Sequence, residues 1–326
     1  MRKLKLALMI LALSVSSCFA EPLIIKDSGL KLSVAEKQEY IAGVMANFFK
    51  PNANAKPYKF AAPDGWTLES FKLDDLKIER LKNNNENKTQ RAILELHGGG
   101  YVMGLTENHK LLAAKQGVLI NAAEVYYVDY RLAPEHVYPA ALDDAVKAYK
   151  YLLENKVKPE NIIVIGDSAG GNLALALALY LRDNKIAMPG ALALISPWGT
   201  FAQDLNSRVK NAERDLVLGV TNKNLYTEVQ AKRPSYAGDL DLKDPKLSPI
   251  YADMTGLSPM LIQVGGYELF TDDGLELLKR ALECDVQASL SVYPGMPHDF
   301  PLLFGELDDT VKALYEFRDF VNRIIK

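Results

Sequence analysis

A serine between two glycines is the most chemically informative feature of this sequence. Residues 166–170 read Gly-Asp-Ser-Ala-Gly, after an apolar run at 162–165 and before an Ala- and Leu-rich segment that starts at Asn172. Gly-x-Ser-x-Gly between a strand and a helix is typical of a strained turn that exposes a serine nucleophile. Small flanking residues let the neighbouring backbones approach. At the start of a helix, Ser168 would also lie in positive potential, which favours a developing oxyanion.

A run of three glycines lies upstream of this serine. Residues 97–101 read His-Gly-Gly-Gly-Tyr and follow an apolar run at 92–96. Glycines present backbone N–H groups without obstruction by a side chain. In lipase- and esterase-type hydrolases a loop at this place supplies part of the oxyanion hole. A flexible loop or a phosphate cradle is the alternative, but the Gly-Lys-Ser/Thr of a Walker loop is absent and no dinucleotide fingerprint is matched.

A serine nucleophile needs a base, and histidine commonly fills that role. The chain has four histidines: His97, His109, His136 and His298. Only His298 lies C-terminal to Ser168, in a loop just past the last expected strand, where hydrolases with this order of residues carry the base. We therefore predict that His298 takes the proton of Ser168. His97 is expected to shape the glycine loop, and His109 and His136 to be surface or structural residues.

The acid that orients the base should follow the expected strand at residues 259–264. The loop after it offers three carboxylates: Glu268, Asp272 and Asp273. Asp272 and Asp273 resemble the N-cap and first-turn acids of a helix, which is a common structural use of Asp. Glu268 lies nearer the end of the strand, so we prefer it as the partner of His298. Asp272 remains the fallback.

The elements that would position these residues alternate between strands and helices. The expected strands cover residues 92–96, 124–128, 162–165, 191–195, 259–264 and 289–293. The expected helices cover residues 140–153, 172–181, 272–282 and 308–325. Such alternation of apolar strands with helices indicates an α/β fold, with a mostly parallel sheet covered by helices on both faces.

Three further segments complete the predicted organisation. Residues 33–50 have helical spacing, and residues 71–81 alternate loosely and predict one strand. Residues 200–257 interrupt the strand–helix rhythm with polar, Pro-bearing, partly helical sequence. We expect this insertion, together with residues 30–60, to lie over the carboxyl edge of the sheet.

Composition excludes several classes of protein. The 326 residues are 48% hydrophobic and 24% charged, with a formal net charge of −3, which is ordinary for a globular protein and unlike a disordered chain. Without a strong basic balance, no nucleic-acid partner is expected. Cys18 and Cys284 are the two cysteines, too few for a disulfide scaffold or a Cys-rich zinc site. Cys284 is expected to be a packed thiol rather than a nucleophile.

The first twenty residues resemble a targeting signal rather than part of the fold. A cationic start at residues 1–5 is followed by an apolar run at 6–15 and by small residues up to Ala20. This order is typical of a secretory signal peptide, and the run is shorter than a membrane-spanning helix. We predict export to the periplasm or the medium. Residues 15–18 also resemble a lipobox, in which case Cys18 would carry lipid and tether the protein to a membrane.

Taken together, the motifs resemble the hormone-sensitive-lipase-like family of α/β-hydrolase esterases. The resemblance rests on residues 97–101, Tyr-Arg-Leu-Ala-Pro-Glu-His at 130–136, Pro-Ala-Ala-Leu-Asp-Asp at 139–144, residues 166–172, Ser-Pro-Trp at 196–198, Asp-Pro-Lys-Leu-Ser-Pro at 244–249 and Gly-Met-Pro-His at 295–298. It implies an α/β-hydrolase fold with Ser168 as nucleophile and His298 as base. It also implies an oxyanion hole formed by the backbone N–H groups of Gly99, Gly100 and Ala169.

The same resemblance implies one α/β-hydrolase domain over residues 21–326, with a helical cap formed by about 21–60 and 200–250. No metal or organic cofactor is implied. The acid departs from the family pattern, because many members have Asp-Pro-Leu-x-Asp-Glu where this chain has Glu-Leu-Phe-Thr-Asp-Asp from Glu268. Glu268 would therefore replace the usual Asp. The pair Tyr130–Arg131, together with Glu135, is expected to form a structural brace.

The expected function is hydrolysis of short- to medium-chain carboxylic esters through an acyl-enzyme. Two other functions stay open: a non-catalytic module that binds a small molecule on the same fold, and a hydrolase of amides, lactones or carbamates that uses the same serine. Tyr101, Phe201 and Tyr236 could line the substrate pocket, but packing is the preferred interpretation. The expected partner is a small ester, and the sequence does not fix the oligomeric state.

Overall fold

The computed structural model describes residue 23 and residues 25–48, 58–220 and 231–326. The predictions for residues 1–20, including Cys18, lie outside these ranges, as do the parts of the expected cap at residues 21, 22, 24, 49–57 and 221–230. Within the described ranges, no helix has both the length and the apolar character needed to cross a membrane.

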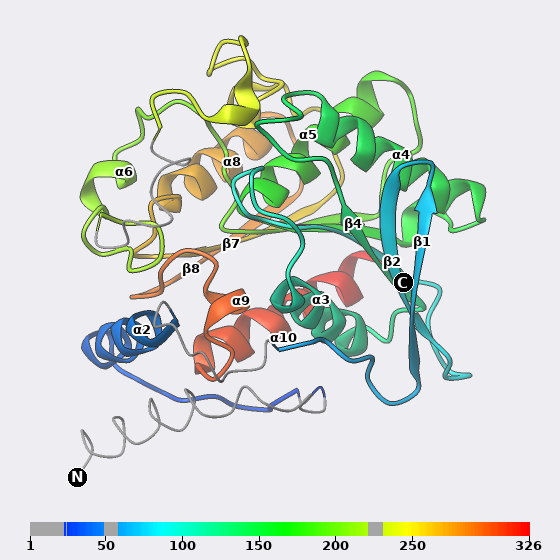
Figure 1. Ribbon diagram of the computed structural model, residues 1–326, viewed down its shortest axis with the longest axis horizontal. Helices are drawn as coiled ribbons and strands as arrows, with labels where there is room; N and C mark the ends of the chain where they lie inside the picture. Colours follow the sequence, from blue (N-terminus) through cyan, green and yellow to red (C-terminus); the bar gives the residue numbers. More distant parts are fainter. Residues whose placement is uncertain (1–22, 24, 49–57, 221–230) are drawn as a thin grey trace.

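An eight-stranded sheet forms the centre of the protein (Figure 1). Its strands are β1 (Trp66–Leu73), β2 (Leu76–Asn83), β3 (Ala92–Leu96), β4 (Glu124–Asp129), β5 (Ile162–Asp167), β6 (Ala191–Ile195), β7 (Met260–Gly265) and β8 (Ala288–Tyr293), in the spatial order β1-β2-β4-β3-β5-β6-β7-β8. β1 pairs antiparallel with β2, and β2 antiparallel with β4, whereas every other pair is parallel. The predicted mostly parallel α/β sheet is therefore confirmed.

Helices cover both faces of the sheet. The helices are α2 (Val34–Phe48), α3 (Glu107–Leu119), α4 (Ala140–Glu154), α5 (Ala169–Asp183), α6 (Ser207–Lys210), α8 (Thr271–Glu283), α9 (Phe300–Leu303) and α10 (Asp308–Ile324). Figure 1 shows α3 and α10 on one face, with α4, α5 and α8 on the other.

The central strand β5 shows why both faces need a cover. Ile162 and Val164 belong to the core under α4, α5 and α8, whereas Ile163 and Ile165 belong to the core under α3 and α10. Successive side chains of a strand point to opposite faces, so a continuous apolar run marks a strand that is buried on both sides. Ser168 directly follows such a strand.

The single strand predicted at residues 71–81 is wrong. The segment spans two antiparallel strands, β1 and β2, joined by a tight turn at Asp74 and Asp75, with Leu73 paired to Leu76. Asp74 has a φ of 54°, a left-handed conformation that Asp adopts more readily than most residues. Loose alternation continues through the turn, which is why the pattern hid it.

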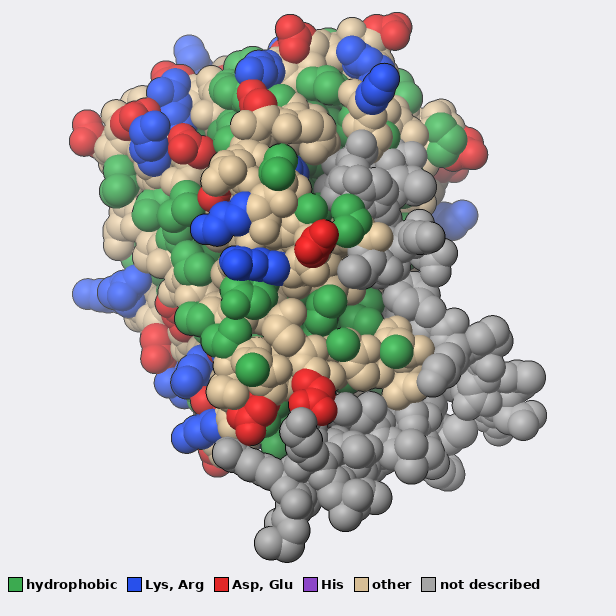
Figure 2. Space-filling view, turned by 90° about the vertical axis from the view of Figure 1, so that its left-hand side faces the viewer, with side chains coloured by type: hydrophobic (Ala, Val, Ile, Leu, Met, Phe, Trp, Pro, Cys, Tyr) green, Lys and Arg blue, Asp and Glu red, His purple; other side chains and the backbone are tan. Residues whose placement is uncertain are grey.

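The segment between β6 and β7 is mostly irregular where it is described. It contains the four-residue helix α6 and 3₁₀ turns at Ser235–Ala237 and Pro249–Tyr251. The helical cap therefore stays a prediction. Figure 2 shows acidic and basic side chains interspersed over the described part of one face, without a patch of a single charge.

The N-terminal helix α2 contacts the loop that follows β8. The ammonium of Lys37 donates to the carbonyl oxygen of Pro294 at 2.9 Å and lies 2.7 Å from a carboxylate oxygen of Asp309. The side-chain amide of Gln38 donates to the carbonyl oxygen of Gly295. A segment far away in the sequence thus holds the loop that carries His298.

Candidate active site

Ser168 lies on the tight turn between β5 and α5. Its backbone has φ 51° and ψ −116°, a strained conformation that costs of order 1–3 kcal/mol and is found most often at functional sites. A Cβ atom at Gly166 would lie 2.3 Å from the carbonyl oxygen of Gly170, so the turn closes only around glycine. Ala169 is the first residue of α5. Its backbone N–H therefore lies at the N-terminal end of the helix, where anions are stabilised.

His298 reaches Ser168 from the loop after β8. Its Nε2 lies 2.9 Å from Oγ of Ser168, within hydrogen-bond distance. Both side chains are buried, with 4% of Ser168 and 2% of His298 exposed. The structure thus brings together two residues that are 130 positions apart in the sequence.

Glu268 faces the other side of the imidazole. Its Oε2 lies 3.6 Å from Nδ1 of His298, longer than a hydrogen bond, as is common for catalytic contacts without substrate. The same oxygen accepts a 2.6 Å hydrogen bond from Oγ of Ser196. Burial raises the pKa of Glu268 to about 7, although His298 and Ser196 both favour its charged form.

The two other candidate carboxylates lie in the first turn of α8, whose N-cap is Phe270, and they point elsewhere. Asp272 accepts a hydrogen bond from the backbone N–H of Ser207. Asp273 is fully buried and pairs with the guanidinium of Arg208 at 2.7 Å. Of the three candidate acids, Glu268 is the one that the structure places beside His298.

Hydrogen bonds fix the glycine loop, residues 97–101, to the turn that carries Ser168. The backbone N–H of Gly98 donates to Oδ1 of Asp167 at 3.0 Å. Gly99 and Gly100 have φ angles of 110° and 63°, which suit glycine and would strain other residues. The hydroxyl of Tyr101 donates to the side chain of Asn172 on α5. These contacts hold the loop against the end of α5.

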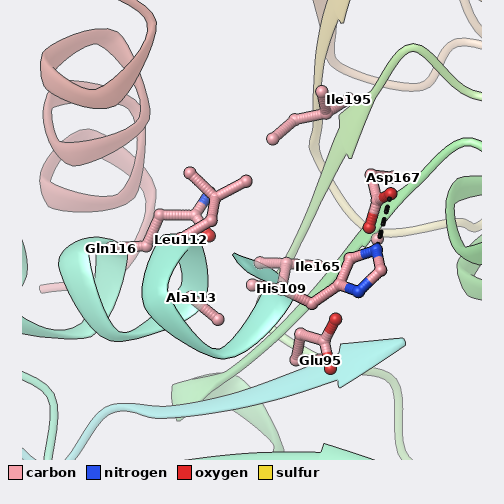
Figure 3. A pocket seen from close by; sticks show the side chains of 9 residues that line it. Glu95, His109, Leu112, Ala113, Gln116, Ile165, Asp167 and Ile195 are labelled. Carbon is pink, nitrogen blue, oxygen red and sulfur yellow. Dashed lines mark ion pairs between the residues drawn. The ribbon is translucent and has the colours of Figure 1, made fainter. Parts of the chain in front are cut away.

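A second set of buried titratable groups lies beside the turn that carries Ser168. Figure 3 shows Glu95, His109 and Asp167 among the side chains that line a small pocket. This pocket has a volume of about 10 Å³, at the lower limit for one water molecule. Nε2 of His109 lies 3.4 Å from Asp167, and this carboxylate outweighs the effect of burial and raises the pKa of His109 to about 9. His109 is therefore a structural residue and not a surface one. His97 is also buried, and burial lowers its pKa to about 3.

The predicted brace around Tyr130 and Arg131 forms with Asp144 in place of Glu135. The guanidinium of Arg131 pairs with Asp144 at 2.9 Å, whereas Glu135 is exposed. The hydroxyl of Tyr130 donates to the carbonyl oxygen of His97, at the base of the glycine loop. The brace is structural, as predicted, but Asp144 replaces Glu135 because it lies on the first turns of α4, facing Arg131.

The three aromatic residues proposed for a pocket or for packing are packed. Tyr101 and Tyr236 stack at 3.7 Å between ring centroids, and Phe201 stacks on Trp198 at 4.1 Å. All three are buried. Cys284 is half-buried and its Sγ accepts the N–H of Met254, as expected of a packed thiol.

Two residues of the site were not predicted. Asp215 accepts from the backbone N–H groups of Leu269 and His298, and so ties the loop that carries Glu268 to the loop that carries His298. Oδ2 of Asp299 lies 3.0 Å from Nε2 of His298. Asp299 follows His298 directly, and this adjacency is a signal that could have found it. Nothing in the local sequence marks Asp215.

Metal ligation has no candidate in the described ranges. No group of three or more His, Cys, Asp or Glu side chains there is arranged to hold an ion.

A strained serine between strand and helix, a histidine after the last strand and a glycine loop beside them define the chain as an α/β hydrolase. The family model described as alpha/beta hydrolase fold matches residues 93–302, so the chain belongs to that family. Within it, the chain is a member of the hormone-sensitive-lipase-like group of esterases.

Two relatives and one solved structure illustrate this membership. The chain is 34% identical to an esterase of Acinetobacter venetianus over 258 residues, 79% of this chain and 82% of that protein. It is 36% identical to an acetyl-hydrolase of Streptomyces hygroscopicus over 208 residues, 64% of this chain and 67% of that protein. An esterase of the bacterial hormone-sensitive lipase family matches with a TM-score of 0.78 at 28% identity, covering 91% of this chain and all of that one.

Proposed function

We propose that this protein is a serine esterase that cleaves carboxylic esters with short to medium acyl chains. The observation that carries the proposal is the 2.9 Å contact between Nε2 of His298 and Oγ of Ser168. Nucleophile and base within hydrogen-bond reach, with an acid behind the base, are the arrangement that activates a serine. The similarity to an acetyl-hydrolase supports small acyl groups as substrates of this chain.

In the proposed mechanism, Ser168 attacks the ester carbonyl while His298 takes its proton. The N–H groups of Gly99, Gly100 and Ala169 stabilise the oxyanion, and one such donor typically lowers the barrier by about 3 kcal/mol. His298 then protonates the departing alcohol, which leaves an acyl group on Ser168. Water, deprotonated by His298, attacks that acyl group, and the acid leaves as Ser168 regains its proton. Glu268 orients the imidazole and stabilises its charged form.

Purified protein assayed on p-nitrophenyl esters from acetate to octanoate, beside Ser168→Ala, tests the proposal. We expect hydrolysis by the wild type with a maximum at short or medium chains, and loss of that activity in the variant. A fluorophosphonate probe should label the wild type and not Ser168→Ala. Full activity in Ser168→Ala would rule out the proposed nucleophile.

The other two functions give different outcomes in the same assays. A binding module without catalysis would neither hydrolyse the esters nor react with the probe. An amide or lactone hydrolase would react with the probe at Ser168 but turn over an amide or lactone faster than the esters. A substrate screen across these three classes separates the alternatives.

We also propose that the chain is exported and loses residues 1–20, because the order of cationic, apolar and small residues is that of a secretory signal. Mass spectrometry of the mature N-terminus in the native host tests this. A chain that begins at Glu21 supports the plain signal, and a lipidated Cys18 at the N-terminus supports the membrane tether. A retained Met1 contradicts both.

A further inference from the structure

The base His298 has two partners on one nitrogen atom. Nε2 lies 2.9 Å from Oγ of Ser168 and 3.0 Å from Oδ2 of Asp299. The proposed mechanism uses the first contact and leaves the second without a role. Asp299 is 7% exposed, and its other oxygen, Oδ1, has no hydrogen-bond partner among the residues that the structure describes. A buried carboxylate with an unpartnered oxygen is costly and calls for an explanation.

The backbone holds Asp299 in this position. Its φ of 48° and ψ of 37° are left-handed, and its Oδ2 contacts the imidazole nitrogen of the preceding residue. Its N–H donates to Oγ of Ser196, and that hydroxyl donates to Glu268. Hydrogen bonds through Ser196 therefore link the backbone of Asp299 to Glu268 on the other side of the imidazole. They hold Asp299 in place within the site.

The charged groups around the imidazole come from several elements. They are Asp299 on its own loop, Glu268 after β7, Asp215 at the backbone N–H of His298, and Asp167 and His109, whose charges act on Asp299. The ring of Phe270 packs edge-on against His298 at 4.8 Å and separates it from Arg208, which pairs with Asp273. Within the described ranges, the imidazole therefore has carboxylates near both nitrogen atoms and no cation in direct contact.

Nε2 carries either a proton or a lone pair, and the two partners prefer different forms. Ser168 can give up its proton only to the lone pair. An ionised Asp299 instead attracts the protonated nitrogen. Burial opposes the charge on His298, but Asp299 and Glu268 outweigh it and raise its pKa well above the usual range. Burial raises the pKa of Asp299 itself to about 6, so its carboxylate is mainly ionised in neutral and alkaline solution.

We propose that Asp299 is a further catalytic residue of the proposed esterase: it competes with Ser168 for Nε2 of His298 in the resting enzyme and stabilises the imidazolium during acyl transfer. The proton that Ser168 gives to Nε2 then stays on this nitrogen, facing both Oγ of Ser168 and Oδ2 of Asp299, until it moves to the departing alcohol. Asp299 neither gains nor loses an atom in the cycle.

The carboxylate of Asp299 therefore has two effects on kcat/KM: it moves activity to higher pH and it raises the rate on the plateau. Activity requires neutral His298, so the acid limb of kcat/KM follows the pKa of the free enzyme's base. A carboxylate that favours the imidazolium moves this limb to higher pH. It also lowers the barrier on the plateau, because the same charge forms in the transition state.

The test compares pH profiles of kcat/KM for p-nitrophenyl acetate in the wild type and Asp299→Asn. Asn also tolerates left-handed backbone, so the loop should keep its shape. We expect the acid limb of the variant to move down by about one pH unit or more, the effect of losing one close opposite charge. On the plateau the variant should be slower, and at low pH at least as fast as the wild type.

Asp285→Asn is the matched control. Asp285 is exposed and has a φ of 55°, so the same substitution is made in the same backbone conformation away from the site. Its profile should coincide with that of the wild type. If Asp299→Asn does not fold, Asp299→Gly removes the carboxylate and also suits the left-handed backbone. A uniform loss of rate with an unmoved acid limb would mean that Asp299 only holds the loop, and would overturn the proposal.

This inference rests on the proposed function, and one measurement separates their failures. An NMR titration of the His298 ring in Ser168→Ala, with and without Asp299→Asn, requires no turnover. The pKa of His298 should fall when Asp299 is replaced, whether or not esters are substrates. Absence of ester hydrolysis in the wild type would contradict the proposed function alone. An unchanged His298 pKa would contradict the role of Asp299 alone.

Discussion

Gly170 lies so close to β3 that a Cβ atom on it would be 1.8 Å from the carbonyl oxygen of Leu96. It would also be 2.6 Å from the carbonyl oxygen of His97. Both obstacles are backbone atoms, which cannot rotate away. The first turn of α5 therefore packs directly on the strand that leads into the glycine loop, and this contact fixes the distance between Ser168 and that loop.

Gly170→Ala should consequently destabilise the protein and disturb the site. We expect a loss of about 1–3 kcal/mol in the free energy of unfolding, the usual range for overpacking. Urea unfolding measures the loss. Gly305→Ala is the control, because its Cβ would meet only the end of the Lys115 side chain, at 3.8 Å. Equal stability of the two variants would contradict the packing argument.

Glu268→Gln should abolish most of the esterase activity while leaving the fold intact. Loss of the acid's charge in a serine triad lowers kcat by about 10⁴-fold, because the base loses its orientation and its stabilised charge. Asp272→Asn is the matched variant, four residues further on in the first turn of α8, and we expect it to keep most of its activity. Kinetics of both on one ester decide the assignment, and the reverse pattern would make Asp272 the acid.

Much of this site could be predicted because its residues follow the carboxyl ends of parallel strands. Ser168 follows β5, Glu268 follows β7 and His298 follows β8, so strand prediction alone brings their loops to one edge of the sheet. The structure places Glu268 rather than Asp272 beside His298, in keeping with its nearness to the strand end.

The other contacts in and around the site depend on packing between distant segments, which local sequence patterns do not encode. Asp215 reaches His298 from 83 positions away. His109 was expected to be surface or structural, but the fold buries it against Asp167. Asp144 is the partner of Arg131 because α4 folds back on the loop after β4.

Arg208 and Asp273 form a buried ion pair next to the loop that carries Glu268, with side-chain exposures of 5% and 0%. Arg208→Met should cost about 3–5 kcal/mol, because it leaves the Asp273 carboxylate buried without its cation. The double variant with Asp273→Asn should recover part of this loss. Urea unfolding of the three proteins provides the measurement.

Arg318→Met is the matched control for this ion pair. Arg318 pairs with Asp319 on the surface of α10, where a salt bridge contributes about 1 kcal/mol or less. A loss in Arg208→Met no larger than in Arg318→Met would show that the buried pair does not stabilise the loop that carries Glu268.

Glu95 gives the protein a pH-dependent stability. Burial raises its pKa from 4.5 to about 8 in the folded chain. Between these values the folded state keeps a proton that the unfolded state releases, so the free energy of unfolding falls as the pH rises. His109, whose pKa rises from 6.5 to about 9 beside Asp167, acts in the same direction between 6.5 and 9. His97, with its pKa lowered from 6.5 to about 3, acts oppositely but only below 6.5.

Glu95→Gln isolates this contribution, because Gln has nearly the same shape and does not ionise. Between pH 6.5 and 8 the urea midpoint of the wild type should therefore fall more steeply with rising pH than that of the variant. Glu86→Gln, on an exposed turn, should parallel the wild type throughout. Parallel midpoints for wild type and Glu95→Gln would mean that Glu95 is ionised in the folded chain, and that the cavity beside His109 stabilises its charge.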